Sequence, residues 1–271
     1  MRCHDPSDGS ADSLPKGGRA ISCYFWGGTV SGTTTQTAGP KRGRSLLPER
    51  LVVGYEAFLG GRFTREKDRF RHLAEAGQKP RIMLIGCCDS RVSPEVIFET
   101  EPGELFVLRN IANLVPPYAP NDDLHGTSAA LEFGVIALGV EHLVVMGHAS
   151  CGGVRAFARG EANAGRAPLS PGDFIGKWIS LINTAAARIE PAGETLDDYI
   201  ERLALASIVQ GLANLRTFPW IAEREQQGKL GLHGAYFGIS RGILLAFDEV
   251  SRRFKPIAAR AHRAAFARPG S

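Results

Sequence analysis

Two short segments of the sequence carry side chains that can bind a metal ion. They read GCCDSR (residues 86–91) and GHASCGG (residues 147–153). Together they offer two thiolates, one imidazole and one carboxylate, a set that suits tetrahedral zinc, from Cys87, Cys151, His148 and Asp89. His148 and Cys151 are close enough in sequence for one loop to direct both at a single ion. Cys87 and Asp89 are separated by one residue and can point the same way from an extended segment.

The fourth of these ligands distinguishes the site from a structural zinc knuckle. A structural zinc usually has four Cys or His ligands, and only three are of that kind here. Asp89 is followed two residues later by Arg91, whose guanidinium can hold a carboxylate by two charge-assisted hydrogen bonds. While Arg91 holds Asp89, the fourth zinc position is open to water, and when Asp89 moves to zinc that position is blocked. We therefore interpret the pair as a gate on a catalytic zinc, with one ion per chain.

The ligand set also predicts how activity depends on pH. Zinc lowers the pKa of a bound water from 15.7 to about 7. Zinc with two thiolates and one neutral imidazole is formally neutral, whereas zinc with three histidines keeps two positive charges, so the water should be less acidic here. We expect activity to rise above neutral pH.

The segments around the two loops predict an α/β fold. Short continuous apolar runs, typical of strands buried in a parallel sheet, occur at residues 82–85, 105–108, 143–146, 235–239 and 243–247. Helical patterns lie at residues 46–59, 65–76, 128–138, 154–159, 174–187 and 198–218. Both loops directly follow an apolar run, and loops at the carboxyl ends of neighbouring parallel strands converge on one crevice. We predict a mainly parallel central β-sheet flanked by helices, with the metal in that crevice.

Composition and charge exclude several classes of protein. The chain has 271 residues, 44% of them hydrophobic and 22% charged, which is typical of globular proteins. Its formal net charge of +4 is too small to imply a nucleic-acid or membrane partner. Five cysteines do not suggest a secreted disulfide framework. The short apolar segment at residues 20–26 does not fit a signal peptide, so we expect a cytoplasmic protein.

The first part of the chain differs from the rest. Only 12 of residues 1–44 are hydrophobic, and Gly, Ser and Thr cluster at residues 27–35. We predict a disordered or weakly ordered polar tail over residues 1–44, followed by one α/β domain over residues 45–260. The sequence has no methionine between Met1 and Met83, and we hypothesise that part of the tail lies upstream of the native product.

The two loops resemble those of the β-class carbonic anhydrases, in particular the plant-like branch, which share a Cys-x-Asp-Ser-Arg loop and a His-x-x-Cys-Gly-Gly loop. The similarity extends to Gln78, to ELFVLRNIAN (residues 104–113) and to GTSAALE (residues 126–132), and covers roughly residues 46–250. It implies reversible hydration of CO2 to bicarbonate and a proton by zinc-bound hydroxide. It also implies a homodimer or homotetramer, in which N-terminal helices of one subunit embrace the next. Residues 46–59 would form that arm, with a self-packed amphipathic helix as an equal alternative.

The resemblance assigns roles to the residues of the two loops. Cys87, His148 and Cys151 would be the constant zinc ligands. Asp89 would be the switching ligand and Arg91 its partner.

The resemblance also implies a substrate pocket for CO2 and bicarbonate. Gln78 would donate a hydrogen bond to the substrate, and the backbone N–H of Gly152 would help to hold a bicarbonate oxygen. Phe106, Ile111 and Phe133 would form an apolar wall, which excludes water that would compete for the nucleophile. The plant-like branch often has valine and tyrosine at the positions of Ile111 and Phe133.

Three other interpretations compete with this one. A zinc hydrolase of CS2 or COS can share the same metal loops. A zinc-stabilised binding or regulatory module would need no open zinc position and no Arg91. A thiol redox enzyme would use the adjacent Cys87 and Cys88, but adjacent cysteines form strained rings, and the usual redox motif is Cys-x-x-Cys.

Overall fold

The computed structural model describes residues 46–121, 123–160, 168, 170–189, 192–258 and 260. The chain divides into two compact units, Met1–Val53 and Gly54–Ser271. Of the first unit, the structure describes residues 46–53, which include the start of helix α1 (Glu49–Phe58). The polar tail predicted for residues 1–44 lies outside the described residues.

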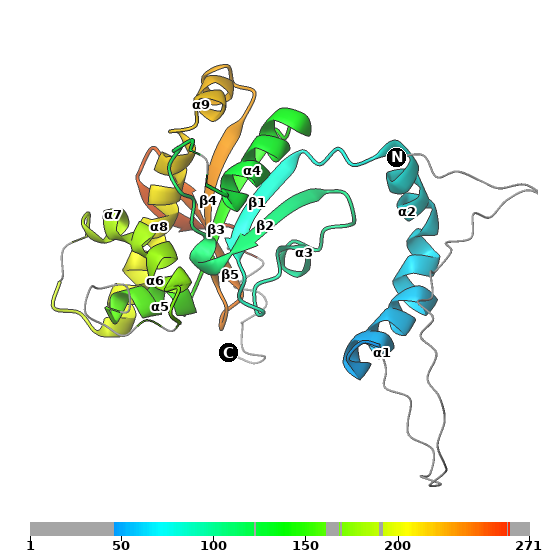
Figure 1. Cartoon of the computed structure of the whole chain (residues 1–271), viewed down its shortest axis with the longest axis horizontal. Helices are drawn as coiled ribbons and strands as arrows, with labels where there is room; N and C mark the ends of the chain where they lie inside the picture. Colours follow the sequence, from blue (N-terminus) through cyan, green and yellow to red (C-terminus); the bar gives the residue numbers. More distant parts are fainter. Residues whose placement is uncertain are drawn as a thin grey trace, which may run out of the picture. The chain divides into compact units, whose positions relative to one another are not determined.

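The second unit is built on one six-stranded sheet (Figure 1). Its strands lie in the order β2-β1-β3-β4-β5-β6. Their bounds are β1 (Ile82–Cys87), β2 (Leu105–Asn110), β3 (His142–His148), β4 (Gly231–Gly238), β5 (Ile243–Asp248) and β6 (Arg253–Pro256). The pairs β1–β2, β1–β3 and β3–β4 are parallel, whereas β4–β5 and β5–β6 are antiparallel. The predicted mainly parallel central sheet is confirmed, with an antiparallel extension at one edge.

The helices after α1 connect and flank these strands. They are α2 (Thr64–Ala76), α3 (Pro94–Ile97), α4 (Gly126–Glu132), α5 (Gly152–Ala158), α6 (Phe174–Ile179), α7 (Asn183–Ala186), α8 (Leu196–Leu215) and α9 (Pro219–Gln226). A π-helical turn (Phe133–Ala137) extends α4, and a 3-10 turn (Ser180–Ile182) joins α6 to α7. Among the described helices, none is both long enough and apolar enough to cross a membrane.

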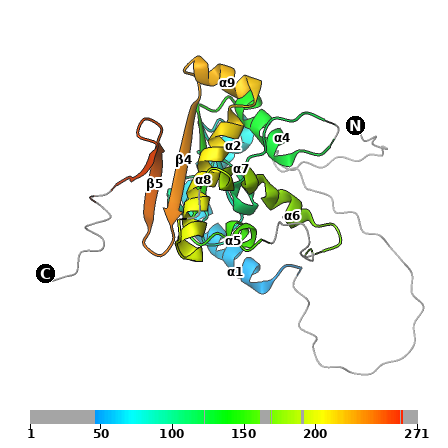
Figure 2. The ribbon, with the colours of Figure 1, turned by 90° about the vertical axis from the view of Figure 1, so that its left-hand side faces the viewer.

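Helix α8 packs across β3 and β4 and contributes to the main core with them (Figure 2). Thr195 begins this helix, because its hydroxyl accepts a hydrogen bond from the Asp198 N–H at 3.2 Å. Gly211 lets α8 approach the sheet closely, since a Cβ at that position would lie 3.3 Å from a Val145 methyl. The opposite face of the sheet carries a smaller cluster of Leu84 and Met146 with neighbouring side chains.

Helices α1 and α2 differ in how they are held. Phe58, Phe63 and Phe70 form a cluster of aromatic rings with centroids 5.4–5.7 Å apart, which ties the end of α1 to α2. Arg69 of α2 donates a 2.9 Å hydrogen bond to the Pro102 carbonyl and so holds α2 to the segment before β2. Neither helix has a buried residue, but α1 exposes large apolar side chains: Leu51, Val53 and Tyr55.

Candidate metal centre

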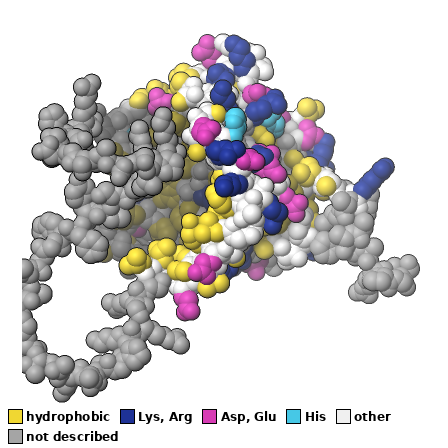
Figure 3. Space-filling view, turned by 90° about the vertical axis from the view of Figure 1, so that its right-hand side faces the viewer, with side chains coloured by type: hydrophobic (Ala, Val, Ile, Leu, Met, Phe, Trp, Pro, Cys, Tyr) yellow, Lys and Arg dark blue, Asp and Glu magenta, His cyan; other side chains and the backbone are white. Residues whose placement is uncertain are grey.

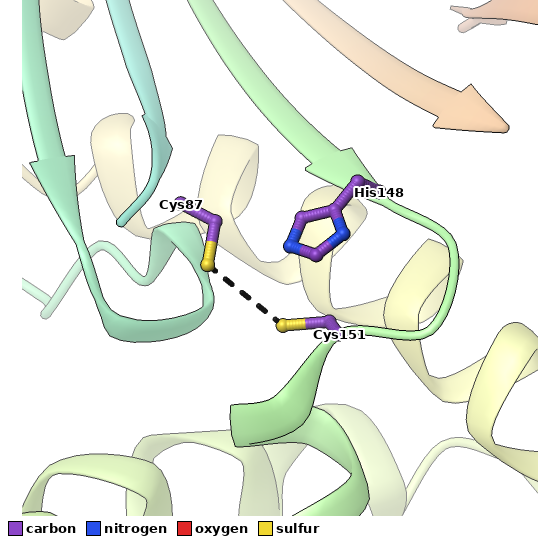
Figure 4. A group of neighbouring side chains, drawn as sticks. All are labelled: Cys87, His148 and Cys151. Carbon is purple, nitrogen blue, oxygen red and sulfur yellow. Dashed lines mark hydrogen bonds between the residues drawn. The ribbon is translucent and has the colours of Figure 1, made fainter. Parts of the chain in front are cut away.

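The two predicted loops meet because the strands that precede them are parallel neighbours. Cys87 ends β1 and His148 ends β3, and these strands pair directly. Cys151 follows one turn later and is the residue from which α5 begins. The three side chains point toward one another (Figure 4), and all their ligand atoms lie within 4.8 Å of one another. All three residues are buried.

The geometry of the three donors fits a tetrahedral metal ion. The sulfur atoms of Cys87 and Cys151 are 4.0 Å apart, and two sulfurs bound to one zinc at 2.3 Å would be about 3.8 Å apart. The Nδ1 atom of His148 lies 2.9 Å from the Ala149 carbonyl. Because a carbonyl only accepts, Nδ1 carries the proton and Nε2 presents its lone pair. That Nε2 atom is buried without a hydrogen-bond partner, the condition expected of a nitrogen that binds a metal.

Backbone amides around the two cysteines favour the thiolate form. The hydrogen bond with Cys151 lowers the pKa of Cys87 to about 4, and the backbone N–H groups of Asp89 and Ala112 act in the same direction. The same bond and burial raise the pKa of Cys151, so the pair first loses the proton of Cys87. A thiolate favoured in this way can bind a cation.

Asp89 is held beside this group by Arg91. Nε of Arg91 donates to Oδ1 at 2.9 Å, Nη2 donates to Oδ2 at 2.7 Å, and the Arg91 backbone N–H donates to Oδ1 at 3.0 Å. The Arg91 guanidinium keeps the pKa of Asp89 well below its usual range. The Asp89 Oδ2 atom lies 3.9 Å from Nε2 of His148. The carboxylate is thus next to the donor group but bound to arginine.

Arg109 fixes the backbone of the first loop, a contact that the sequence alone does not predict. From β2, its Nε donates to the Cys87 carbonyl at 2.8 Å and its Nη2 to the Asp89 carbonyl at 2.6 Å. One guanidinium therefore holds the residues on both sides of Cys88. In the sequence, the sign of this role is a charged residue near the end of an apolar run. The contact itself depends on the pairing of β1 with β2.

A tight turn after β2 lies beneath the first loop. The Asn110 side chain closes this turn, because its amide donates to the Leu114 carbonyl and its carbonyl accepts from the Leu114 N–H, both at 2.8 Å. Within the turn, Ala112 and Asn113 have φ angles of 61° and 49°. This left-handed backbone, uncommon for residues other than glycine, lets the Ala112 N–H hydrogen-bond to Cys87. The segment RNIAN (residues 109–113) thus holds the first loop in place.

The residues predicted to bind substrate are spread more widely. Ile111 borders a largely apolar hollow of about 400 Å³ next to the first loop, which is also lined by Cys88, Asn110, Phe174, Ile175 and Trp178. Gly152 is the first residue of α5, directly after Cys151. Cys88 is exposed, while Cys87 is buried and contacts Cys151 instead. The structure therefore does not show Cys87 and Cys88 as a joint redox pair.

The remaining predicted pocket residues lie away from the donors of their own chain. Phe106 and Phe133 contact each other, with ring centroids 5.8 Å apart. Phe106 pairs with Met83, four residues before Cys87, which is about 13 Å along the strand. Gln78 is exposed in the segment between α2 and β1. Within one chain, the structure brings Ile111 and Gly152 to the donor group, but not these three side chains.

The fold and the site define an α/β protein with a group of three side chains that could hold a metal ion at the carboxyl ends of neighbouring parallel strands. The family model described as carbonic anhydrase matches residues 82–244, which include both loops. A carbonic anhydrase of Pseudomonas aeruginosa is 36% identical over 210 residues, or 77% of this chain and 91% of the relative. The chain belongs to the β-carbonic anhydrase family.

Solved structures agree with this assignment. The β-carbonic anhydrase CcaA superimposes with a TM-score of 0.67 at 33% identity, covering 77% of this chain and 98% of that one. A β-carbonic anhydrase from Sordaria macrospora, described as tetrameric, gives a TM-score of 0.59 at 29% identity over 77% of this chain and 95% of its own.

Proposed function

We propose that this protein catalyses the reversible hydration of CO2 to bicarbonate and a proton, with one zinc ion held by Cys87, His148 and Cys151. The observation that carries this function is the donor group itself: three buried ligands, with a fourth candidate, Asp89, held to one side by Arg91. A structural zinc would have a closed shell of four ligands, whereas a catalytic zinc keeps one position open. Bound zinc would supply a water molecule of lowered pKa.

Asp89 and Gly152 have defined tasks in this mechanism. Asp89 stays ionised because Arg91 lowers its pKa. Its carboxylate can accept a hydrogen bond from the attacking water, which directs a lone pair of that water toward CO2. The backbone N–H of Gly152, at the start of α5, holds an oxygen of the bicarbonate that forms. The water oxygen forms the new C–O bond, and its proton leaves to solvent.

The pair of Asp89 and Arg91 is the gate of this site. Two charge-assisted hydrogen bonds hold the carboxylate in the position that leaves the fourth ligand place open. When Asp89 leaves Arg91, its oxygen can occupy that place and exclude the reacting water. Arg91 also donates to the Ser150 carbonyl at 3.3 Å, so the arginine is tied to the second loop as well.

The apolar wall requires a second copy of the chain. Ile111 lies at the site, but Phe106 is about 13 Å along the strands from Cys87 of its own chain, and Phe133 packs against Phe106. If these rings and Gln78 contact CO2, they do so across an interface between subunits. The exposed apolar side chains of α1 also favour a homodimer or homotetramer. Figure 3 shows hydrophobic side chains among charged ones on one face of the molecule.

The thiolate ligands suit a reducing compartment. Cys87 and Cys151 are both free, and their sulfur atoms face each other at 4.0 Å. Oxidation of either thiol would remove a zinc ligand, so the site is best kept where thiols stay reduced. We propose a cytoplasmic location on this ground.

Stopped-flow measurement of CO2 hydration on protein of known zinc content tests the proposed function. We expect about one zinc per chain and turnover that disappears when a chelator removes the zinc and returns when zinc is restored. Hydrolysis of CS2 and COS should be measured on the same sample. A zinc-loaded protein that hydrolyses CS2 or COS but not CO2 would contradict the substrate assignment, and one inactive on all three would indicate a structural zinc.

A further inference from the structure

Strand β3 carries a histidine at each end. His148, at its carboxyl end, belongs to the donor group described above. His142 begins the strand at the opposite edge of the sheet, about 20 Å away at the usual rise of a strand. His142 is exposed and is not used by the proposed mechanism.

The His142 ring faces the ring of His233 on the neighbouring strand β4. Nδ1 of His142 lies 3.2 Å from Nε2 of His233. The ring centroids are 5.2 Å apart, and the ring planes are inclined by 58°. These two nitrogen atoms share a hydrogen bond, whose proton a metal ion bound to both rings would displace.

The pairing of the two strands explains this approach. His142 pairs with Gly231 in the parallel register, and His233 is two residues further along β4 on the same face. Gly231 has no side chain to separate the rings. A Cβ placed there would lie 2.9 Å from Nε2 of His233 and 3.1 Å from Nδ1 of His142. A larger residue would displace the rings from each other.

We propose that His142 and His233 form a second metal site, which takes a divalent transition-metal ion of the zinc, nickel and copper class. Two imidazole nitrogens bound at 2.0–2.1 Å to one tetrahedral ion are about 3.3 Å apart, and the two nitrogens here are 3.2 Å apart. Imidazole is a ligand that zinc, copper and nickel share, whereas magnesium and calcium prefer oxygen. Water completes the coordination because both rings are exposed.

The charged groups around the pair do not attract cations in general. Selectivity for a metal ion therefore comes from the two imidazole ligands. Glu141 precedes His142, and its carboxylate is bound to Arg81. Glu249 acts on His233 through its charge, and its carboxylate is bound to Arg216. The carboxylates that would attract a hard cation are thus engaged with arginines.

Two positively charged side chains also lie near the pair. Arg224 and Lys229 line the hollow that His142 borders and oppose a purely electrostatic attraction of cations. Partial burial and the charge of His142 lower the pKa of His233, which favours the neutral ring, the form that binds metals.

Equilibrium dialysis of the zinc-loaded protein against Ni²⁺ tests this site. We expect a second equivalent of metal beyond the zinc, with the zinc content unchanged. His142→Gln and His233→Gln should each weaken nickel binding about tenfold or more, because either change leaves one protein ligand. His72→Gln, which removes an exposed histidine of α2, is the matched control and should bind nickel as the unaltered chain does. Circular dichroism and zinc content establish that each variant is folded.

A measurement on the unaltered chain gives independent evidence. Paramagnetic Ni²⁺ should broaden the backbone amide signals around His142 and residues 231–233 before those of other histidines. A second equivalent that survives both substitutions, broadening centred elsewhere, or the lack of any second equivalent at millimolar nickel would overturn the proposal. None of these readouts depends on CO2 hydration, so the result is independent of the proposed function.

Discussion

Arg109 donates a hydrogen bond of 2.6 Å to the backbone carbonyl of Asp89. The same guanidinium donates to the Cys87 carbonyl at 2.8 Å. Both carbonyls therefore point at β2, and the side chains of Cys87 and Asp89 are left to act at the metal site. The contact joins a residue that has no direct part in the chemistry to two that do.

Replacing Arg109 should loosen the metal site. In Arg109→Met, two hydrogen bonds to the loop are lost, and we expect zinc to be removed by a chelator about tenfold faster, with a comparable loss of CO2 hydration. Zinc release can be followed with a chromogenic chelator. The control is Arg71→Met, which removes an exposed arginine paired with Asp68 on α2. Equal zinc release from both variants would show that the loop does not need the clamp.

Replacing Arg91 should separate zinc binding from turnover. Arg91 contacts Asp89 but is not one of the three ligands. We expect Arg91→Ala to keep one zinc per chain and to lose at least about tenfold in kcat, because Asp89 is then free to occupy the fourth position. Arg91→Lys keeps the charge but not the two-point contact, so its kcat should lie between that of the unaltered chain and that of Arg91→Ala. Full activity of Arg91→Ala would exclude the gate.

The pH dependence can be predicted from the low pKa of Asp89. Because the folded state lowers this pKa, the stabilisation from the Asp89 pair is complete above about pH 4 and is lost as the pH falls further. Asp89 therefore does not titrate between pH 6.5 and 9. We expect CO2 hydration to rise through that range with a single ionisation, that of the zinc-bound water. Stopped-flow rates at constant ionic strength would show it, and activity that is flat or falling above pH 7 would disagree.

Two neighbouring glycines offer a matched test of packing beneath the site. A Cβ at Gly153 would lie 2.9 Å from an Ile111 methyl and 3.0 Å from the Ala112 Cβ, whereas a Cβ at Gly152 meets nothing within 4 Å. We expect Gly153→Ala to lower the free energy of unfolding by about 1–3 kcal/mol. Gly152→Ala should change it by less than about 0.5 kcal/mol. Urea denaturation of the zinc-loaded proteins would compare them, and equal stabilities would contradict the tight packing at Gly153.

Much of the fold could be predicted from local patterns. The apolar runs that became β1 and β3 are continuous because both sides of these strands are covered, and both metal loops follow them, whereas β2 lies at the edge and is half-buried. Strand β4 is longer than predicted, since it begins at Gly231, and glycines conceal a strand pattern. Helix α9 was not predicted, because the predicted helix ended at residue 218. The break between α8 and α9 falls at residues 216–218, and Pro219 then begins α9.

The sequence predicts only those parts of the site that follow from the spacing of residues along the chain. Cys87, His148 and Cys151 lie in two short loops, and their meeting follows from strand order alone. The clamp by Arg109 and the left-handed turn at Ala112 depend on which residues face each other across β1 and β2. Such contacts arise from register, which a single sequence does not reveal. For the same reason, the distance of Phe106 from Cys87 became apparent only with the strands in place.

The clamp on the first loop also sets the speed of the gate. With the carbonyls of Cys87 and Asp89 held by Arg109, the backbone is fixed, and Asp89 can change partner only by rotation about its own side-chain bonds. Exposed side chains rotate in picoseconds to nanoseconds, and Asp89, which must first break its hydrogen bonds with Arg91, rotates more slowly than that. Movements of loops or domains take up to milliseconds. Such a side-chain gate would remain in equilibrium during every turnover, so it would set the fraction of active sites that are open without becoming the slow step.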